Sequence, residues 1–159
     1  MRVRFAQIGL ALALVLLALS LAACSIDVGD EVNVRETGLP GYPGARLIQD
    51  GDRSESARVN IDTSLFGLGV VAAEFETDDD SEAVLAFYRD AMKPYGPVTE
   101  CRGDVQFNDR QAVCEPDPDS AEVQLVTGSE DDQRIVAVKP RGTGAEFAVV
   151  HVQTRVERN

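Results

Sequence analysis

Residues 71–92, VAAEFETDDDSEAVLAFYRDAM, contain a strand pattern followed directly by a helix pattern. Residues 71–77 alternate between two faces, which predicts a half-buried β-strand. Residues 78–81 supply N-cap side chains and negative charge for a helix start, and Pro94 and Gly96 end that helix. Apolar residues then recur at the spacing of one helix face: Val84, Phe87, Tyr88, Ala91 and Met92.

The segments on both sides of this stretch favour strands. The strand over 58–63 is expected to form a hairpin with 71–77 around a turn at 66–69. Further strands are expected over 46–49, 98–102, 111–114, 122–127, 135–139 and 147–154. The sequence therefore predicts an α+β fold: a curved antiparallel sheet of about six to eight strands, with one main amphipathic helix packed on one face, after an N-terminal signal helix.

Composition limits the classes of protein to consider. The chain has 159 residues, 44% of them hydrophobic, and a formal net charge of −12. This length fits one compact domain, and the hydrophobic fraction excludes general disorder. The negative charge argues against nucleic acid as a partner, because phosphates would be repelled.

The N-terminal segment differs from everything after it. Arg2 and Arg4 precede a nearly unbroken apolar run over residues 8–23. The run is short for a membrane-spanning helix, which needs about 20 apolar residues. It has the length of the apolar region of a signal peptide.

Leu21-Ala22-Ala23-Cys24 at the end of this run resembles the lipobox of bacterial lipoproteins. The resemblance implies cleavage before Cys24 and acylation of Cys24 with palmitate-type chains, and two or more such chains anchor a protein stably. It divides the chain into a signal peptide (1–23), a lipidated N-terminus with a flexible acidic tether (24–38) and a single α+β domain (39–159). An ordinary signal peptide or an uncleaved anchor would also fit residues 1–23.

Three further segments resemble small, uncharacterised bacterial envelope lipoproteins. They are Tyr42-Pro43-Gly44-Ala45, Glu76-Thr77-Asp78-Asp79-Asp80 and Phe87-Tyr88-Arg89. The resemblance implies a membrane-anchored protein facing the periplasm or the exterior. It carries no activity over to any residue of this chain.

Cys101 and Cys114 remain as an even pair once Cys24 is assigned to the lipobox. They are expected to form a disulfide between two strands of a hairpin that turns near Phe107. A redox-active pair would have C-x-x-C spacing, and a zinc site would need more ligands than this pair and His151 offer.

Other polar residues give weaker signals. His151, the only histidine, is expected to be a partly buried residue on the same side of its strand as Phe147 and Val149. Acidic turns make weak candidates for a divalent-cation site, because calcium takes six to eight oxygen ligands. The candidates are Asp117, Asp119, Asp131 and Asp132.

Two functions are consistent with these patterns. The first is a non-enzymatic, lipid-anchored accessory domain that binds another envelope component, with no cofactor and no nucleic-acid partner. Such a domain should expose an apolar patch or an open sheet edge. The alternative is a module that binds a small ligand or a divalent cation through its acidic turns. The sequence shows no motif that pairs a nucleophile with a base, so an enzyme is not the expected function. An enzymatic alternative stays open and would need Glu or Asp residues that converge in a pocket with perturbed pKa values.

Overall fold

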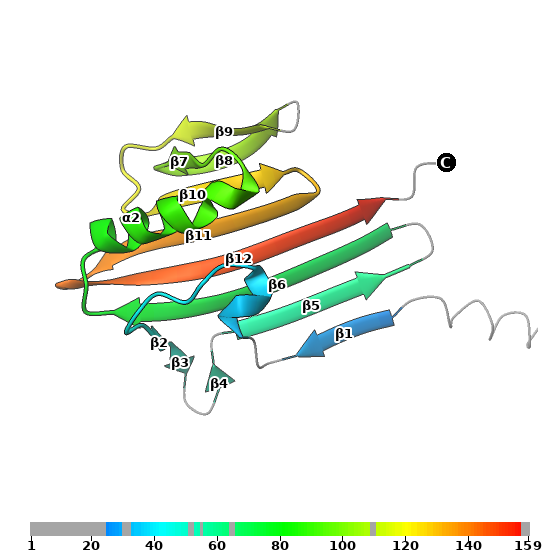
Figure 1. Cartoon of the computed structure of the whole chain (residues 1–159), viewed down its shortest axis with the longest axis horizontal. Helices are drawn as coiled ribbons and strands as arrows, with labels where there is room; N and C mark the ends of the chain where they lie inside the picture. Colours follow the sequence, from blue (N-terminus) through cyan, green and yellow to red (C-terminus); the bar gives the residue numbers. More distant parts are fainter. Residues whose placement is uncertain are drawn as a thin grey trace, which may run out of the picture.

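The computed structural model describes residues 25–29, 33–50, 53–54, 56–63, 66–108 and 111–156. Within these residues the main sheet is antiparallel, in the order β1-β5-β6-β12-β11-β10-β7, and β2 also pairs with β6 (Figure 1). Its strands are β1 (Ser25–Gly29), β2 (Arg46–Leu47), β5 (Ser56–Asp62), β6 (Phe66–Thr77), β7 (Thr99–Cys101), β10 (Val123–Ser129), β11 (Asp132–Arg141) and β12 (Gly144–Val156).

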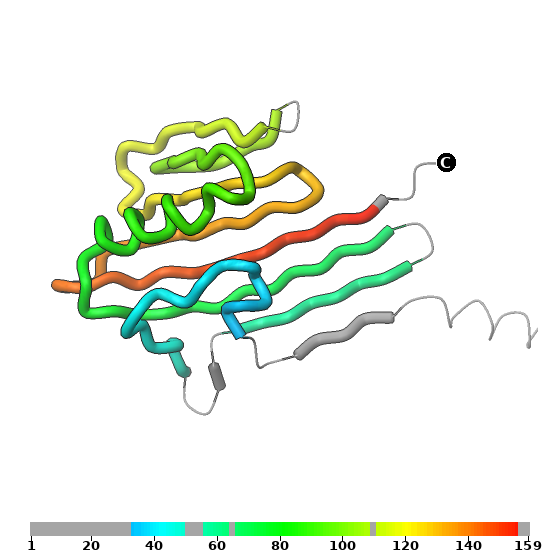
Figure 2. The backbone as a smooth tube through the Cα atoms, in the orientation of Figure 1, coloured from blue at the N-terminus to red at the C-terminus, as the bar shows by residue number. Residues whose placement is uncertain are grey.

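Smaller elements flank this sheet. Two hairpins form separate two-stranded sheets. They are β3 (Gln49–Asp50) with β4 (Arg53–Ser54), and β8 (Gly103–Asn108) with β9 (Gln111–Pro116). Helix α2 (Ser81–Met92) continues into the 3-10 turn η3 (Lys93–Tyr95), and a second 3-10 turn, η2 (Val34–Thr37), lies nearer the N-terminus. The chain path places the last strand, β12, between β6 and β11 in the middle of the sheet (Figure 2). The predicted α+β fold with one main helix is confirmed.

Helix α2 begins and packs as its sequence predicts. Asp80 has an extended backbone, and its side chain accepts a hydrogen bond from the Ala83 amide at 2.8 Å. Val84, Tyr88 and Met92 are buried, as the spacing predicts, and Leu85 is buried as well. The helix contacts β10, β11 and β12, so its apolar side covers the middle of the sheet.

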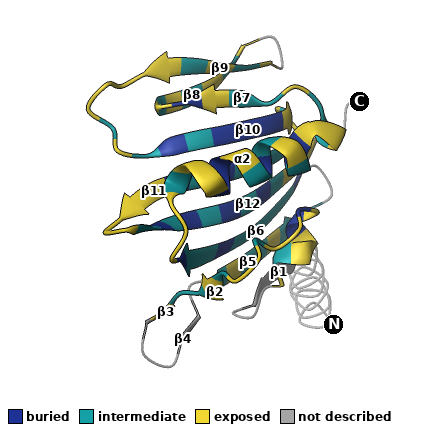
Figure 3. Cartoon of the chain, turned by 60° about the vertical axis from the view of Figure 1, so that its left-hand side comes forward, coloured by how far each residue is buried: buried dark blue, intermediate teal, exposed yellow. Residues whose placement is uncertain are grey.

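The core lies between α2 and the side of the sheet that it covers, which we call the helix face. Its largest sheet residue is Phe147, whose ring contacts Tyr88 and stacks on Phe75. The strands beneath α2 carry the deeply buried residues (Figure 3). The helix-face strand residues that belong to the hydrophobic core are Val123, Leu125, Val136, Val138, Ala145, Phe147 and Val149.

The hairpin of β5 and β6 is confirmed, but its predicted turn is wrong. Residues 66–69 belong to β6, where Gly67 pairs with Asp62 and Gly69 with Asn60. Gly69 leaves room for the Asn60 side chain on the helix face, because a Cβ at Gly69 would lie only 3.2 Å from the Asn60 side-chain oxygen. They therefore serve close packing across a strand and not a chain reversal.

The described parts of the predicted flexible tether 24–38, residues 25–29 and 33–38, contain regular structure. Ser25–Gly29 forms β1, which pairs with β5 along its whole length. Asn33 caps η2 in a capping box with Glu36, and Thr37 is buried. A strand can pair through its backbone hydrogen bonds without a strong apolar pattern. The acidic composition of this segment therefore suggested a tether although part of it is a strand. The predicted signal peptide 1–23 and Cys24 lie outside the described residues.

No helix among the described residues is long and apolar enough to cross a membrane.

Candidate functional site

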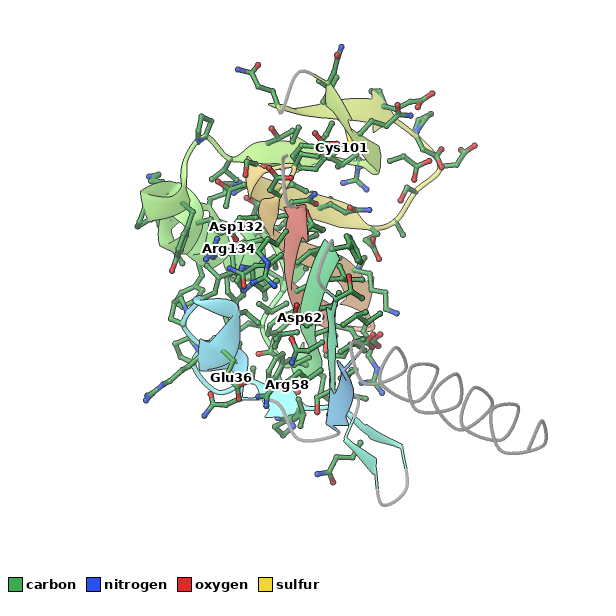
Figure 4. The ribbon with its side chains drawn as sticks, turned by 90° about the vertical axis from the view of Figure 1, so that its right-hand side faces the viewer. Glu36, Arg58, Asp62, Cys101, Asp132 and Arg134 are labelled. Carbon is green, nitrogen blue, oxygen red and sulfur yellow. A yellow bond between two sulfur atoms is a disulfide. The ribbon has the colours of Figure 1, made fainter. Side chains whose placement is uncertain are left out.

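The predicted disulfide between Cys101 and Cys114 is present, with the two Cα atoms 5.3 Å apart. The surrounding hairpin is not the one we expected. Cys101 belongs to β7, which pairs with β10, whereas Cys114 lies in β9 opposite Val105 of β8. Phe107 is therefore a strand residue and not part of a turn. The bond connects two separate sheets, as the place of Cys101 beside the hairpin shows (Figure 4).

The disulfide holds the β8–β9 hairpin against the side of the sheet that faces away from α2. The Thr99 hydroxyl donates to the Ala112 carbonyl at 3.2 Å, and the side-chain amide of Gln124 donates to the Gly103 carbonyl at 3.3 Å. Val126 points away from the helix face yet is only 1% exposed, because the hairpin covers it. The hairpin thus closes this side of the sheet at its β10 end.

The acidic candidates are not brought together. Asp117 and Asp119 form a turn before β10, in which the Asp117 carboxylate accepts from the Asp119 amide at 3.0 Å. Asp131 and Asp132 lie at the opposite end of β10. Among the described residues, no group of three or more His, Cys, Asp or Glu side chains is placed to hold a metal ion.

Asp132 instead belongs to a polar cluster on the helix face. Its Oδ1 lies 2.7 Å from His151 Nε2 and 3.0 Å from Arg134 Nη1 (Figure 4). Burial alone would raise the pKa of Asp132, but the His151 hydrogen bond and the Arg134 charge outweigh burial and lower it. His151 is 9% exposed on the same face as Phe147, which confirms the sequence prediction.

Arg134 connects this cluster to the N-terminal segment. Its guanidinium lies over the Tyr95 ring, 3.9 Å from the ring centroid, and the Tyr95 hydroxyl donates to the Gly38 carbonyl. The cluster joins β11, β12, η3 and the residue after η2. It holds these elements together through the contacts of Asp132 with His151 and Arg134 and through the contact of Arg134 with Tyr95.

The opposite side of the sheet carries an apolar surface that we call the open face. Val150 lies opposite Ile135 and Ala72 in the strand register, and residues directly opposite share a face. None of the side chains on this face is buried, and Phe66 is 39% exposed. The open face consists of Ala57, Val59, Ile61, Phe66, Leu68, Val70, Ala72, Ile135, Ala137, Ala148, Val150 and Val152.

The same side of the sheet becomes charged at its other end, where β6 ends and β12 begins. Arg46 and Arg141 both pair with Glu76, and Lys139 pairs with Glu146. The Glu146 hydrogen bond raises the pKa of Lys139. The surface is therefore apolar at one end and covered by ion pairs at the other. Sequence reasoning expected an apolar patch but could not place it, because only the register brings these strands together.

A shallow hollow of about 440 Å³ lies near the start of β6, and Gly67 and Gly69 are among its lining residues. The Arg155 guanidinium beside it donates to the Asp62 carboxylate at 2.7 Å. Asn60, Asp131 and Gln153 also line the hollow. Its lining is mostly polar, in contrast to the open face.

Comparisons of the chain with protein-family models, with curated proteins and with solved structures gave no match. Function is therefore inferred from the residues and geometry described above.

Proposed function

We propose that this chain is a lipid-anchored envelope protein that works by binding another envelope component and not by catalysis. The observation that carries the proposal is the open face, twelve apolar residues on four neighbouring strands, none of which is buried. The largest exposed apolar patch of a monomer is often functional, and such patches mark contacts with proteins or membranes.

Two further observations support the anchor and the location. Leu21-Ala22-Ala23-Cys24 has the lipobox pattern and follows an apolar run with a basic start. The disulfide between Cys101 and Cys114 suits an oxidising compartment outside the cytosol. A lipoprotein of the cell envelope with its domain facing the periplasm or the exterior would meet both conditions.

The anchor is tested by labelling cells that express the full chain with an alkyne analogue of palmitate. Label is expected on the wild-type chain and is expected to be lost in Cys24→Ala, whereas Cys101→Ser with Cys114→Ser should keep it. In-cell cross-linking of the wild-type and Cys24→Ala chains, read by mass spectrometry, then identifies the bound component. An unlabelled wild-type chain would contradict the proposal.

A second candidate function is binding of a small polar ligand, which the hollow beside Gly67 and Gly69 favours. Ligand binding to the folded state raises the melting temperature. The full chain should then melt at a higher temperature with a polar ligand or with millimolar calcium, and Asp131→Asn should reduce that shift. An unchanged melting temperature across such a screen would remove this candidate.

A further inference from the structure

We propose that the component bound by the open face is the membrane itself, so that the domain lies on the bilayer beside its own anchor. This inference rests on the proposed lipidation of Cys24. Its basis is that Ser25, the residue after Cys24, and the apolar part of the open face lie at the same end of the sheet.

The structure leaves no spacer between the anchor and the sheet. Strand β1 begins at Ser25, one residue after Cys24, and Ser25 pairs with Asp62 at the end of β5. One residue spans at most about 3.6 Å. The acyl chains would therefore start at a corner of the sheet, and the domain could not stand away from the membrane on a tether.

The apolar part of the open face lies at that same corner. The start of β1, the end of β5, the start of β6 and the end of β12 share one end of the sheet (Figure 1). Phe66, the most exposed large residue of the open face, begins β6 there, and Leu68 lies opposite Ile61. The register also sets Ile26 and Val28 of β1 opposite Ile61 and Val59.

On this side of the sheet, the charged side chains lie at the end away from Ser25. The ion pairs of Glu76, Arg141, Lys139 and Glu146 occupy the far end of this side of the sheet. The chain has a formal net charge of −12, which would repel an anionic surface. An uncharged face next to the anchor lets the domain touch lipid without pressing its acidic residues against the headgroups.

The size of the open face argues against a second copy of the chain as its occupant. Four strands at about 4.8 Å spacing and about 20 Å of strand length give roughly 400 Å². A stable interface buries about 800 Å² on each partner. Lipid contact needs no such area, because the acyl chains already hold the protein at the surface.

The experiment uses the absence of tryptophan from the chain. The full-length, lipidated chain carrying Phe66→Trp or Val152→Trp is placed in phosphatidylcholine vesicles with brominated acyl chains, which quench tryptophan on contact. Val113→Trp is the control, because Val113 is 49% exposed on the β8–β9 hairpin, which lies beyond β10 at the opposite edge of the sheet from β1. Circular dichroism checks that each variant is folded.

Tryptophan at 66 and at 152 is expected to lose about half of its emission, since interfacial elements lie about 5–10 Å into the boundary with the acyl chains. Tryptophan at 113 should keep its emission. If all three keep their emission while the protein stays on the vesicles, the anchor stands and membrane docking is wrong. Emission at 66 that changes with protein concentration, without quenching, would assign the face to a second copy. A chain that is not lipidated and does not float with vesicles would overturn both proposals.

Discussion

Thr127 and Thr37 are buried threonines whose hydroxyl groups have opposite surroundings. The Thr37 hydroxyl donates to the Val34 carbonyl at 2.6 Å and accepts from the Leu39 amide at 3.2 Å. The Thr127 hydroxyl has no hydrogen-bond partner among the described residues, although Thr127 is only 1% exposed. A buried hydroxyl without a partner costs free energy, whereas a bonded one contributes stability.

Valine at these two positions should therefore act in opposite directions. Thr127→Val is expected to raise the free energy of unfolding by about 1 kcal/mol, because it removes an unsatisfied polar atom at similar volume. Thr37→Val is expected to lower it by about 1–3 kcal/mol, because it leaves the Leu39 amide without its partner. Urea denaturation of both variants measures the difference. Equal losses at both sites would contradict the assignment at Thr127.

Asp132 makes stability depend on pH. Its pKa is lowered in the folded state by His151 and Arg134, against the opposing effect of burial. Its contribution is therefore present above the ordinary aspartate pKa of about 4 and is lost as the pH falls through the lower folded value. The contribution is expected to stay below about 1 kcal/mol, because the carboxylate is partly exposed.

Urea denaturation at pH 7 and pH 3 tests this effect. The wild-type chain should lose more stability between these pH values than Asp132→Asn does. Asp119→Asn, a change at an exposed turn residue, should behave like the wild type. An Asp132→Asn variant with the full wild-type loss would show that the contacts of Asp132 with His151 and Arg134 add nothing.

Helix α2 depends on its first turn. Asp80 accepts a hydrogen bond from the Ala83 amide and adds negative charge at the helix start. Asp80→Ala should lower the free energy of unfolding by about 1 kcal/mol. Asp80→Asn keeps the acceptor and removes the charge, so it should lose only a few tenths of a kcal/mol. Thermal and urea unfolding of the pair separates the two effects.

The β8–β9 hairpin depends on the disulfide. Cys101 and Cys114 are separated by 13 residues, and closing a loop of this size stabilises a protein by about 3 kcal/mol in the chain-entropy model. Reduction should lower the free energy of unfolding by about that amount. Amide hydrogen exchange should rise more over residues 103–116 than in β6 or β12. Uniform exchange after reduction would mean that the bond does not hold the hairpin specifically.

Helix α2 and strand β7 show why local sequence patterns predict one element and miss the pairing partner of another. The period and capping of α2 are written within 78–92, so its face could be predicted. The partner of residues 99–101 could not, because β7 joins β10 across more than twenty residues. Strand pairing is a long-range choice, and similar alternating segments offer several partners.

Val149 and Val150 test which side of the whole molecule is the core. Val149 is fully buried beneath α2, whereas its neighbour Val150 lies on the open face and is partly exposed. Val149→Ala should lower the free energy of unfolding by about 2–3 kcal/mol, because it leaves a cavity. Val150→Ala should cost less than about 1 kcal/mol. Similar losses would mean that something covers the open face in the folded chain.

The candidate site was predictable only in part. Asp132 and Arg134 share a face because both lie in β11, but the sequence predicted a strand only over 135–139 and assigned Asp132 to an acidic turn. His151 joins them because Arg134 pairs with it in the register of β11 and β12. The open face likewise needs four strands side by side, and no single segment shows it.

The amino-acid sequence by itself determined the α+β class, the position of α2, and the pair Cys101 and Cys114. These features depend on short-range periodicity, capping and composition, which act within a few residues. The tertiary structure alone decided that β1 begins at Ser25 and that the apolar strands share one uncovered side. Both outcomes follow from backbone hydrogen bonds between segments far apart in the chain, and pairing of this kind is set by the whole sheet.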